Sequence, residues 1–359
     1  MSRVLRSARE TEVIAASLKR RYTGVTSTVA ALLPAQARDV KIAALGVALP
    51  ESWPQLAWGD FLRHAWQPPP GRRVRIWHAR RNSEMLAGVF LKRVLRMPLK
   101  LVFTSAAQRH HSGWPRWLLR RMDHVIATSP EAASYLCVPS TVVPHGVDVE
   151  LYRPAENREA EWAATGLPGR YGIAVFGRVR KQKGVDLFVE ALCRLLPKYP
   201  DFTGIAVGAV RPEQVAFARR LAARVTQAAL SGRILFLGER PAAEVPLWLR
   251  RVTIVVGPQR REGFGLVPLE GMASGAAVVA TRVGAAHHLV VDGETGYLVP
   301  PEDLDALTDR IERLLRDPAR AAAMGRRGRA HVVERFAIDR EAEGIRRVYE
   351  RCWGEAEPR

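Results

Sequence analysis

The chain has 359 residues, of which 47% are hydrophobic and 25% are charged, and this length allows two folded domains. Ordinary glycine and proline contents exclude collagen-like and low-complexity proteins, and no apolar run reaches the roughly 18 residues of a transmembrane helix. The formal net charge of +19 favours an anionic partner: nucleic acid, an acidic membrane surface or a phosphorylated substrate. Compositional drift toward arginine in a GC-rich genome is the alternative explanation.

The first residues, MSRVLRSARETEV, mix arginines with acids where a signal peptide needs an apolar stretch, so secretion is not expected. Three widely spaced cysteines, Cys137, Cys193 and Cys352, predict neither a disulfide framework nor a zinc site. Both observations favour a reducing, cytoplasmic compartment.

Short apolar runs alternate with helix-like stretches in the first half of the chain. A loop that contains Gly24 follows the first run, and a helix is predicted from about residue 26. The polar segment 151–170 then resembles an interdomain linker. The strands predicted in this half span residues 13–16, 40–45, 74–78, 99–104, 125–127 and 141–144.

A second series of strands follows the linker. Its members are predicted at residues 171–176, 204–207, 234–237, 253–256, 277–280 and 296–299. Strands that alternate with helices indicate parallel βαβ units, so the predicted fold class is α/β with two doubly wound domains. Ligands of such sheets bind at the carboxyl ends of the strands, which we expect to face a cleft between the domains.

The first chemical motif is FGRVRKQKG, residues 176–184. A strand ends at Phe176, a basic loop bounded by glycines follows, and a helix is predicted from about Val185. A helix N-terminus attracts anions, and Arg178 and Lys183 add full positive charges that suit a diphosphate. The residue order of a P-loop is absent. A solvated basic loop is the alternative.

The second motif is EGFGLVPLE, residues 262–270. Glu262 and Glu270 lie eight positions apart, and Gly263 and Gly265 let the backbone approach a ligand closely. A helix is predicted from Leu266, which places the second carboxylate inside it. Carboxylates accept paired hydrogen bonds from vicinal hydroxyls, as in ribose recognition. Surface charge is the alternative interpretation.

These two motifs and the segment DGETGYLVPPED resemble the family 4 nucleotide-sugar glycosyltransferases, whose GT-B fold has two Rossmann-like domains facing across a cleft. The segment PHGVD is similar to the family's P-N-G-V-D. The segments RRYTGVTSTV, WHARRNSEMLAG and FTSAAQRHH are similar to lipopolysaccharide core mannosyltransferases. The implied domains are an acceptor-binding domain at 1–160, a nucleotide-sugar-binding domain at 161–335, and a terminal helix at 336–359 that crosses back to the first.

The resemblance also implies catalytic roles. Arg178 and Lys183 match the basic pair on the donor diphosphate, Glu262 matches an acid near the donor hexose, and Glu270 matches an acid on the ribose hydroxyls. The implied reaction is retaining transfer without a metal. In this reaction the basic pair and the helix N-terminus stabilise the charge that develops on the leaving diphosphate.

Further donor contacts are implied by the same matches. The backbone of Gly263, Phe264, Gly265 and Leu266 would approach the hexose and the diphosphate, and Gly24 matches a glycine-containing loop near the reaction centre. The chain departs from the family at His288, which stands where an acid is usual. His110 and His111 lie after the point where some relatives carry a histidine, and no role is assigned to the three histidines.

Membrane contact is a separate hypothesis. Residues 112–122 interleave Trp114 and Trp117 with arginines, and a second basic run lies at residues 92–100. Basic residues beside aromatics suit an anionic interface. A buried amphipathic helix is the alternative.

The expected function is transfer of mannose from GDP-mannose to a lipopolysaccharide core acceptor, an anionic glycolipid, at the inner face of the inner membrane. No cofactor is expected besides this donor substrate. A UDP-hexose donor with another acceptor is an alternative, as is an epimerase or phosphorylase on the same scaffold. A basic nucleic-acid-binding protein is a further alternative, although none of the usual nucleic-acid-binding motifs is present.

Overall fold

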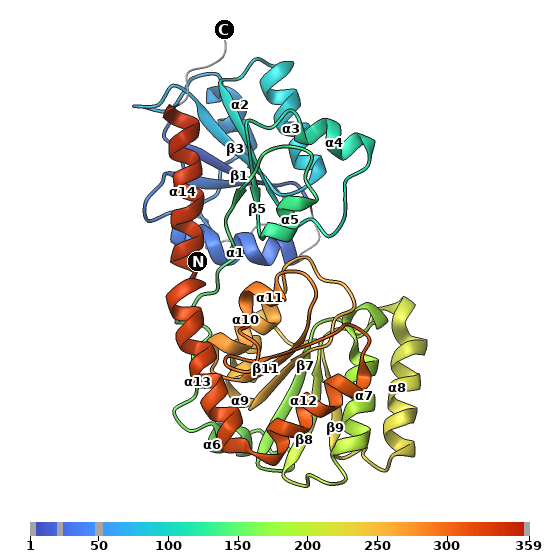
Figure 1. Ribbon diagram of the computed structural model, residues 1–359. Helices are drawn as coiled ribbons and strands as arrows, with labels where there is room; N and C mark the ends of the chain where they lie inside the picture. Colours follow the sequence, from blue (N-terminus) through green and yellow to red (C-terminus); the bar gives the residue numbers. More distant parts are fainter. Residues whose placement is uncertain (1–4, 20–23, 47–52, 355–359) are drawn as a thin grey trace. The chain divides into compact units, whose positions relative to one another are not determined.

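The computed structural model describes residues 5–19, 24–46 and 53–354 (Figure 1). The chain divides into two compact units. Unit 1 comprises Met1–Gly146 with Ile338–Arg359, and unit 2 comprises Val147–Ala337. The predicted boundaries, after residues 160 and 335, therefore lie further along the chain than the first observed division and close to the second.

Unit 1 contains a six-stranded parallel sheet of order β2-β1-β3-β4-β5-β6. Nearly every residue of its first four strands is buried, because helices cover both faces, as parallel sheets require. The strands are β1 (Val13–Ser17), β2 (Ile42–Gly46), β3 (Arg75–Ala79), β4 (Leu99–Ser105), β5 (His124–Ala127) and β6 (Thr141–Val142).

The helices of unit 1 divide between the two faces of this sheet. Those named α2 (Trp58–His64), α3 (Asn82–Arg93) and α4 (Gly113–Leu119) share one apolar cluster with the strands. On the other face, α1 (Gly24–Gln36) packs against α14 (Ile338–Gly354). A short helix, α5 (Pro130–Ser134), follows β5.

A buried polar chain ties the C-terminal helix α14 into unit 1. The ring nitrogens of His78 lie 2.6 Å from the hydroxyl of Tyr349 and 2.7 Å from the hydroxyl of Thr104. Burial, together with the nearby Arg80, holds the pKa of His78 well below its usual range. The imidazole is therefore neutral and bonds β3 both to β4 and to α14.

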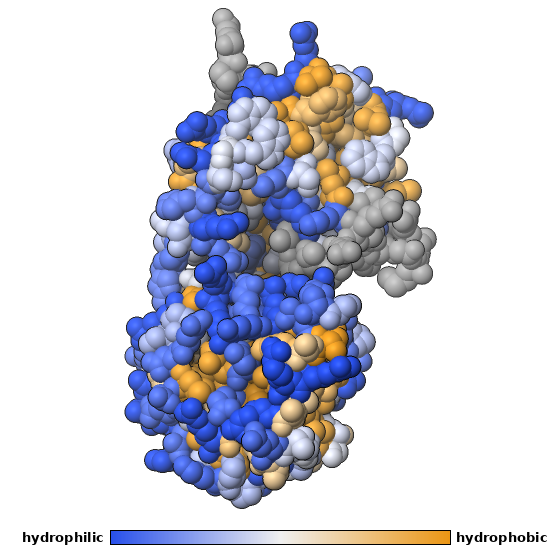
Figure 2. Space-filling view, turned by 90° about the vertical axis from the view of Figure 1, so that its right-hand side faces the viewer, coloured by the Kyte–Doolittle hydropathy of each residue, from blue (hydrophilic) through white to orange (hydrophobic). Residues whose placement is uncertain are grey.

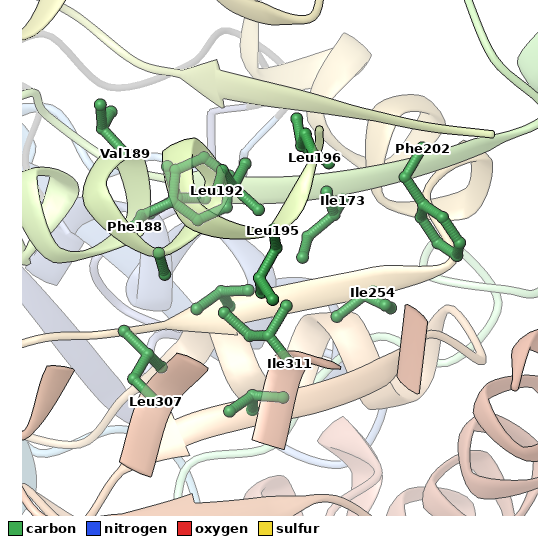
Figure 3. Packing of buried hydrophobic residues seen from close by; sticks show 14 of the residues in the cluster. Ile173, Phe188, Val189, Leu192, Leu195, Leu196, Phe202, Ile254, Leu307 and Ile311 are labelled. Carbon is green, nitrogen blue, oxygen red and sulfur yellow. The ribbon is translucent and has the colours of Figure 1, made fainter. Parts of the chain in front are cut away.

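Unit 2 contains a second six-stranded parallel sheet, of order β12-β11-β10-β7-β8-β9. Two apolar clusters pack against this sheet. In one of them, Leu195 of α7 (Val185–Leu195) and Ile311 of α12 (Leu304–Arg316) point toward each other (Figure 3). The strands are β7 (Tyr171–Phe176), β8 (Phe202–Val207), β9 (Ile234–Gly238), β10 (Ile254–Gly257), β11 (Ala277–Thr281) and β12 (Tyr297–Val299).

The helices of unit 2 cover both faces of its sheet. They are α6 (Arg158–Ala163), α7 (Val185–Leu195), α8 (Val215–Gln227), α9 (Val245–Arg251), α10 (Leu266–Ala273), α11 (Ala286–Leu289), α12 (Leu304–Arg316) and α13 (Pro318–Arg335). All the predicted strands of both units are present, with bounds shifted by at most two residues. No helix in the described part of the chain is both long enough and apolar enough to cross a membrane.

The prediction of a linker at residues 151–170 was wrong. The segment contains α6 and belongs to unit 2. The Trp162 ring is fully buried against Gly172, where an added Cβ would lie only 2.3 Å from it. Arg158 donates hydrogen bonds to the carbonyls of Arg250, Ser274 and Gly275. The polar composition of the segment led to the wrong prediction, because it did not indicate that Trp162 and Arg158 attach the segment to unit 2.

The PHGVD segment lies where the chain passes from unit 1 to unit 2. The Glu341 carboxylate of α14 lies 2.8 Å from Nδ1 of His145 and accepts the backbone N–H of Gly146, also at 2.8 Å. On the unit 2 side, Val147 pairs with Ala337. The outgoing segment of the chain and the returning segment are thus bonded to each other on both sides of the boundary.

Candidate functional site

The sheet of unit 2 reverses its strand order between β7 and β10. The chain builds β8 and β9 on one side of β7 and then returns to place β10 on the other side. In doubly wound sheets, ligands bind outside the carboxyl ends of the strands at such a reversal. The two motifs of the sequence occupy this position, because residues 177–184 follow β7 and residues 258–265 follow β10.

The loop after β7 has a backbone that requires glycine. Gly184 has φ +70° and directly precedes α7. An added Cβ there would lie 1.8 Å from the carbonyl oxygen of Pro258. The loop therefore packs directly against the loop after β10, and the N-terminus of α7 lies at the point where they meet.

The loop after β10 leads into α10 through a second glycine with positive φ. Gly265 has φ +104° and is the residue before the first turn of the helix. Phe264 is buried, and its carbonyl accepts the N–H of Ala285 at 3.0 Å. These contacts anchor the loop to the N-terminal end of α11, and the approach of the backbone of residues 263–266 to a donor stays a prediction.

Two of the predicted catalytic side chains lie together. Lys183 donates to the carboxylate of Glu262, and both side chains are largely but not completely buried. The other carboxylate oxygen of Glu262 accepts the N–H of Gly263 at 3.1 Å. A cation and an anion from loops 79 residues apart therefore meet at the switch point.

The basic charge at this site exceeds the two residues that the sequence singled out. Arg178 is exposed beside the Lys183 loop, and Arg180 follows it with a buried Nε that has no hydrogen-bond partner among the described residues. Burial, and repulsion from Arg178 and Arg211, lower the pKa of Arg180, while Glu262 opposes this effect. Arg178 and Arg180 both lie within the motif at residues 176–184, so the sequence already contained the evidence for this additional positive charge. The cluster suits a ligand with more than one negative charge.

Arg260 fastens the two loops to each other, and the sequence did not reveal this role. Its guanidinium binds the Asp186 carboxylate of α7 bidentately, at 2.8 and 2.9 Å, and contacts Glu302 at 3.0 Å. Its backbone N–H donates to the carbonyl of Gln182 at 2.9 Å. The pKa of Arg260 rises because Asp186 accepts its hydrogen bonds. An ion pair between residues 74 positions apart leaves no local pattern.

Glu270 lies inside α10, one turn beyond Gly265. Protein atoms surround the half-buried carboxyl, and the loss of hydration raises the pKa of Glu270 to about 7, while a hydrogen bond from Tyr152 acts in the opposite direction. The group is therefore poised between its neutral and charged forms near neutral pH. Tyr152 lies in the segment mistaken for a linker, which is why the sequence did not indicate it.

The remaining predicted residues lie elsewhere. Gly24 is the first residue of α1 in unit 1, and residues 20–23 of its predicted loop lie outside the described residues. His110 packs edge-on against Tyr135, with ring centroids 5.2 Å apart. Burial and the neighbouring Arg109 lower the pKa of His111. His288 is exposed on α11. These positions give none of the three histidines a catalytic role.

The overall architecture matches that of solved glycosyltransferases. The structure of HepE from Anabaena, solved in complex with UDP and glucose, superposes with a TM-score of 0.79 over 95% of this chain and all of that chain, at 18% identity. Sucrose-phosphate synthase from Thermosynechococcus elongatus gives the same TM-score over 97% of this chain, at 22% identity. At such identities the likeness shows the fold alone, and it confirms the predicted GT-B class.

Sequence comparisons narrow this class. The family described as glycosyl transferases group 1 matches residues 157–331. The lipopolysaccharide core biosynthesis mannosyltransferase LpcC of Rhizobium leguminosarum bv. viciae is 52% identical over 97% of this chain and 98% of its own length. LpsB of Rhizobium meliloti, which has the same description, is 47% identical over 95% and 98%. The chain belongs to the group 1 glycosyltransferases, so the predicted class of enzyme is confirmed.

Proposed function

We propose that the protein transfers mannose from GDP-mannose to a lipopolysaccharide core acceptor, with retention of configuration and without a metal ion. The observation that carries the proposal is the joining of the two motif loops at the switch point of a chain that is 52% identical to LpcC along almost its whole length. The reaction would take place in the cytoplasm, at the inner face of the inner membrane, where an anionic glycolipid acceptor would be presented.

The donor diphosphate would bind against the loop after β7. Arg178, Lys183 and the first N–H groups of α7 supply positive charge there. The diphosphate would replace Glu262 as the hydrogen-bond partner of Lys183, and Glu262 would then bind the hydroxyls of the hexose. Arg180, two residues after Arg178 on the same loop, adds a further positive charge.

The sugar and the nucleoside would lie along the second loop. The backbone of Gly263, Phe264, Gly265 and Leu266 would approach the hexose and the diphosphate, since the two glycines carry no side chain that would keep a ligand at a distance. Glu270 would accept hydrogen bonds from the two ribose hydroxyls in its charged form. Gly24 of unit 1 would contribute backbone near the reaction centre.

The chemical step breaks the bond between C1 of mannose and the phosphate oxygen, and GDP departs with the bonding electrons. The cationic loop stabilises the charge that accumulates on the departing diphosphate. The acceptor hydroxyl oxygen then bonds to C1 on the face that GDP has left, and its proton passes to the leaving phosphate oxygen. No separate enzyme base is needed.

A binding panel combined with product analysis tests this function. We expect GDP and GDP-mannose to raise the melting temperature more than UDP and UDP-glucose, and we expect an α-linked product whose formation continues in EDTA. Tighter binding of a UDP-hexose would support the alternative donor. A β-linked product would overturn retention, and loss of activity in EDTA that Mg²⁺ restores would overturn metal independence.

A further inference from the structure

Two helices of unit 1 carry apolar residues on the side that faces away from the core. On α3, Met85 and Val89 pack inward, yet every fourth residue on the outer side is also large and apolar. Surface helices are normally polar on that side. The outer residues are Trp58 (41% exposed), Leu62 (46%) and Trp66 (46%) on and just after α2, and Leu86 (43%), Phe90 (50%) and Val94 (63%) on and just after α3.

A third helix extends this surface. On α4, Trp114 and Trp117 are exposed and stack on each other, with ring centroids 4.9 Å apart. The helix packs against α3, and the indole N–H of Trp66 donates to the carbonyl of Leu95 at 2.9 Å. The outer residues of α2, α3 and α4 therefore form one surface, here called the α2–α4 face. Figure 2 looks onto this side of unit 1, where orange and pale residues gather.

The charge on the α2–α4 face has a single sign. Residues 57–71, 82–96 and 112–120 contain only two carboxylates: Asp60 is bonded to His64 at 2.9 Å, and Glu84 is buried. The basic residues of these segments, by contrast, are largely exposed. The exposed ones are Arg63, Arg93, Arg96, Arg116 and Arg120.

We propose that the α2–α4 face docks on an anionic lipid bilayer, an inference that rests on the proposed lipid-linked acceptor. Tryptophan and arginine beside exposed aliphatic side chains match the boundary between headgroups and acyl chains, where rings and apolar groups enter and guanidinium groups bind phosphate. A second copy of the chain is a poor occupant, because it would bring five exposed arginines against the same five without a carboxylate to pair them. The sequence pointed to residues 112–122 and to the basic run at residues 92–100; the outer apolar residues of α2 and α3 were not predicted.

Vesicle co-sedimentation of the full-length protein tests the proposal. The probes are vesicles of phosphatidylcholine alone and vesicles with 30% phosphatidylglycerol. We expect binding to the anionic vesicles, weakened by salt. The variant Arg93→Gln/Arg96→Gln/Arg120→Gln should reduce the partition coefficient about a hundredfold, since each surface arginine accounts for about fivefold. The matched control, Arg219→Gln/Arg220→Gln/Arg326→Gln in unit 2, removes the same charge and should bind like the wild type.

The apolar side chains are tested separately. Leu62→Ser/Phe90→Ser should lower binding at least tenfold, whereas the control Val215→Ser/Leu247→Ser, which alters exposed residues of unit 2, should not. Tryptophan emission should shift to the blue on anionic vesicles and be quenched by brominated lipid. Equal binding to neutral and anionic vesicles, equal losses in variant and control, or a dimer that Leu62→Ser/Phe90→Ser dissociates would overturn the proposal.

The failure of this inference is distinguishable from failure of the proposed function. Mannose transfer to a delipidated core oligosaccharide in free solution does not need a membrane. Its persistence in Leu62→Ser/Phe90→Ser, with loss of transfer to vesicle-bound acceptor, supports the docking face. Transfer to the vesicle-bound acceptor at the wild-type rate by this variant would contradict docking alone, and vesicle binding without transfer from any GDP-sugar would contradict the proposed function alone.

Discussion

The two units share one sheet architecture but use their arginines differently. In unit 2, arginines at the loops are held by carboxylates, as Arg260 is held by Asp186, or lie close to other arginines, as the half-buried Arg180 does. In unit 1, the arginines of the α2–α4 face remain exposed among apolar side chains. The net positive charge thus has two different arrangements. In unit 2 it forms a compact site for a small anion, and in unit 1 it forms a broad surface for an extended anionic partner.

The largest expected effect in this comparison is the loss of the Lys183 charge in unit 2. Lys183→Ala should reduce the transfer rate about 10²–10³-fold, because it removes one charge that stabilises the leaving diphosphate. Steady-state kinetics with GDP-mannose would measure this loss. The control Lys181→Ala lies in the same turn with an exposed side chain and should retain the rate. Equal rates for the two variants would remove Lys183 from the mechanism.

The backbone of the same loop offers the next largest effect. Gly184→Ala should destabilise unit 2 by about 3–4 kcal/mol, because the methyl group meets the Pro258 carbonyl in addition to the left-handed backbone. Gly166 has the same φ of +70°, but an added Cβ there would meet nothing within 4 Å. The control variant Gly166→Ala should therefore lower the free energy of unfolding by only about 1 kcal/mol. Urea unfolding would measure both. A difference within error would mean that the loops do not pack as described.

The titration of Glu270 sharpens the comparison through pH. With a raised pKa of about 7, only about a tenth of this carboxyl is ionised at pH 6 and about nine tenths at pH 8. If the charged form binds the ribose, donor affinity should rise about tenfold between these pH values, and Glu270→Gln should bind weakly and lose this rise. The free energy of unfolding should change in the opposite direction. Because the folded state holds the proton of Glu270 more tightly than the unfolded state does, the wild-type protein loses stability as the pH rises from about 4.5 to 7. Calorimetry of donor binding and pH-dependent melting would show both trends.

The smallest effect is expected at the fastening residue. Arg260→Gln should raise the KM for the donor about fivefold with a smaller change in kcat, since it loosens the two loops without touching the reacting atoms. The control Arg250→Gln breaks a similar ion pair, which joins Arg250 of α9 to Glu161 of α6 at 2.9 Å, and should leave the KM unchanged. A lower kcat with an unchanged KM would contradict the positioning role. Arg260→Lys should restore only part of the affinity, because lysine cannot bind Asp186 bidentately.

Local sequence was enough to predict the strands and the position of both motif loops, because strand periodicity and the glycines at 184 and 265 act over a few residues. It was not enough for Arg260, whose partner is distant along the chain, or for Tyr152, which lay in a polar segment. The segment 151–170 was misread for a related reason: Trp162 is buried only because Gly172 lacks a Cβ. The exposure of the outer apolar residues on α2 and α3 could not be predicted either, because a helix that is apolar on both sides has the sequence pattern of a buried helix.

The passage of α14 back into unit 1 has a consequence for biosynthesis. Unit 2 is one uninterrupted segment, Val147–Ala337. Most of unit 1 precedes unit 2 along the chain, but α14, which follows unit 2, helps α1 to cover one face of the unit 1 sheet and bonds to His78. The segment of unit 1 that is synthesised first therefore cannot finish folding until α14 has left the ribosome, and nascent unit 1 exposes an apolar sheet surface until then.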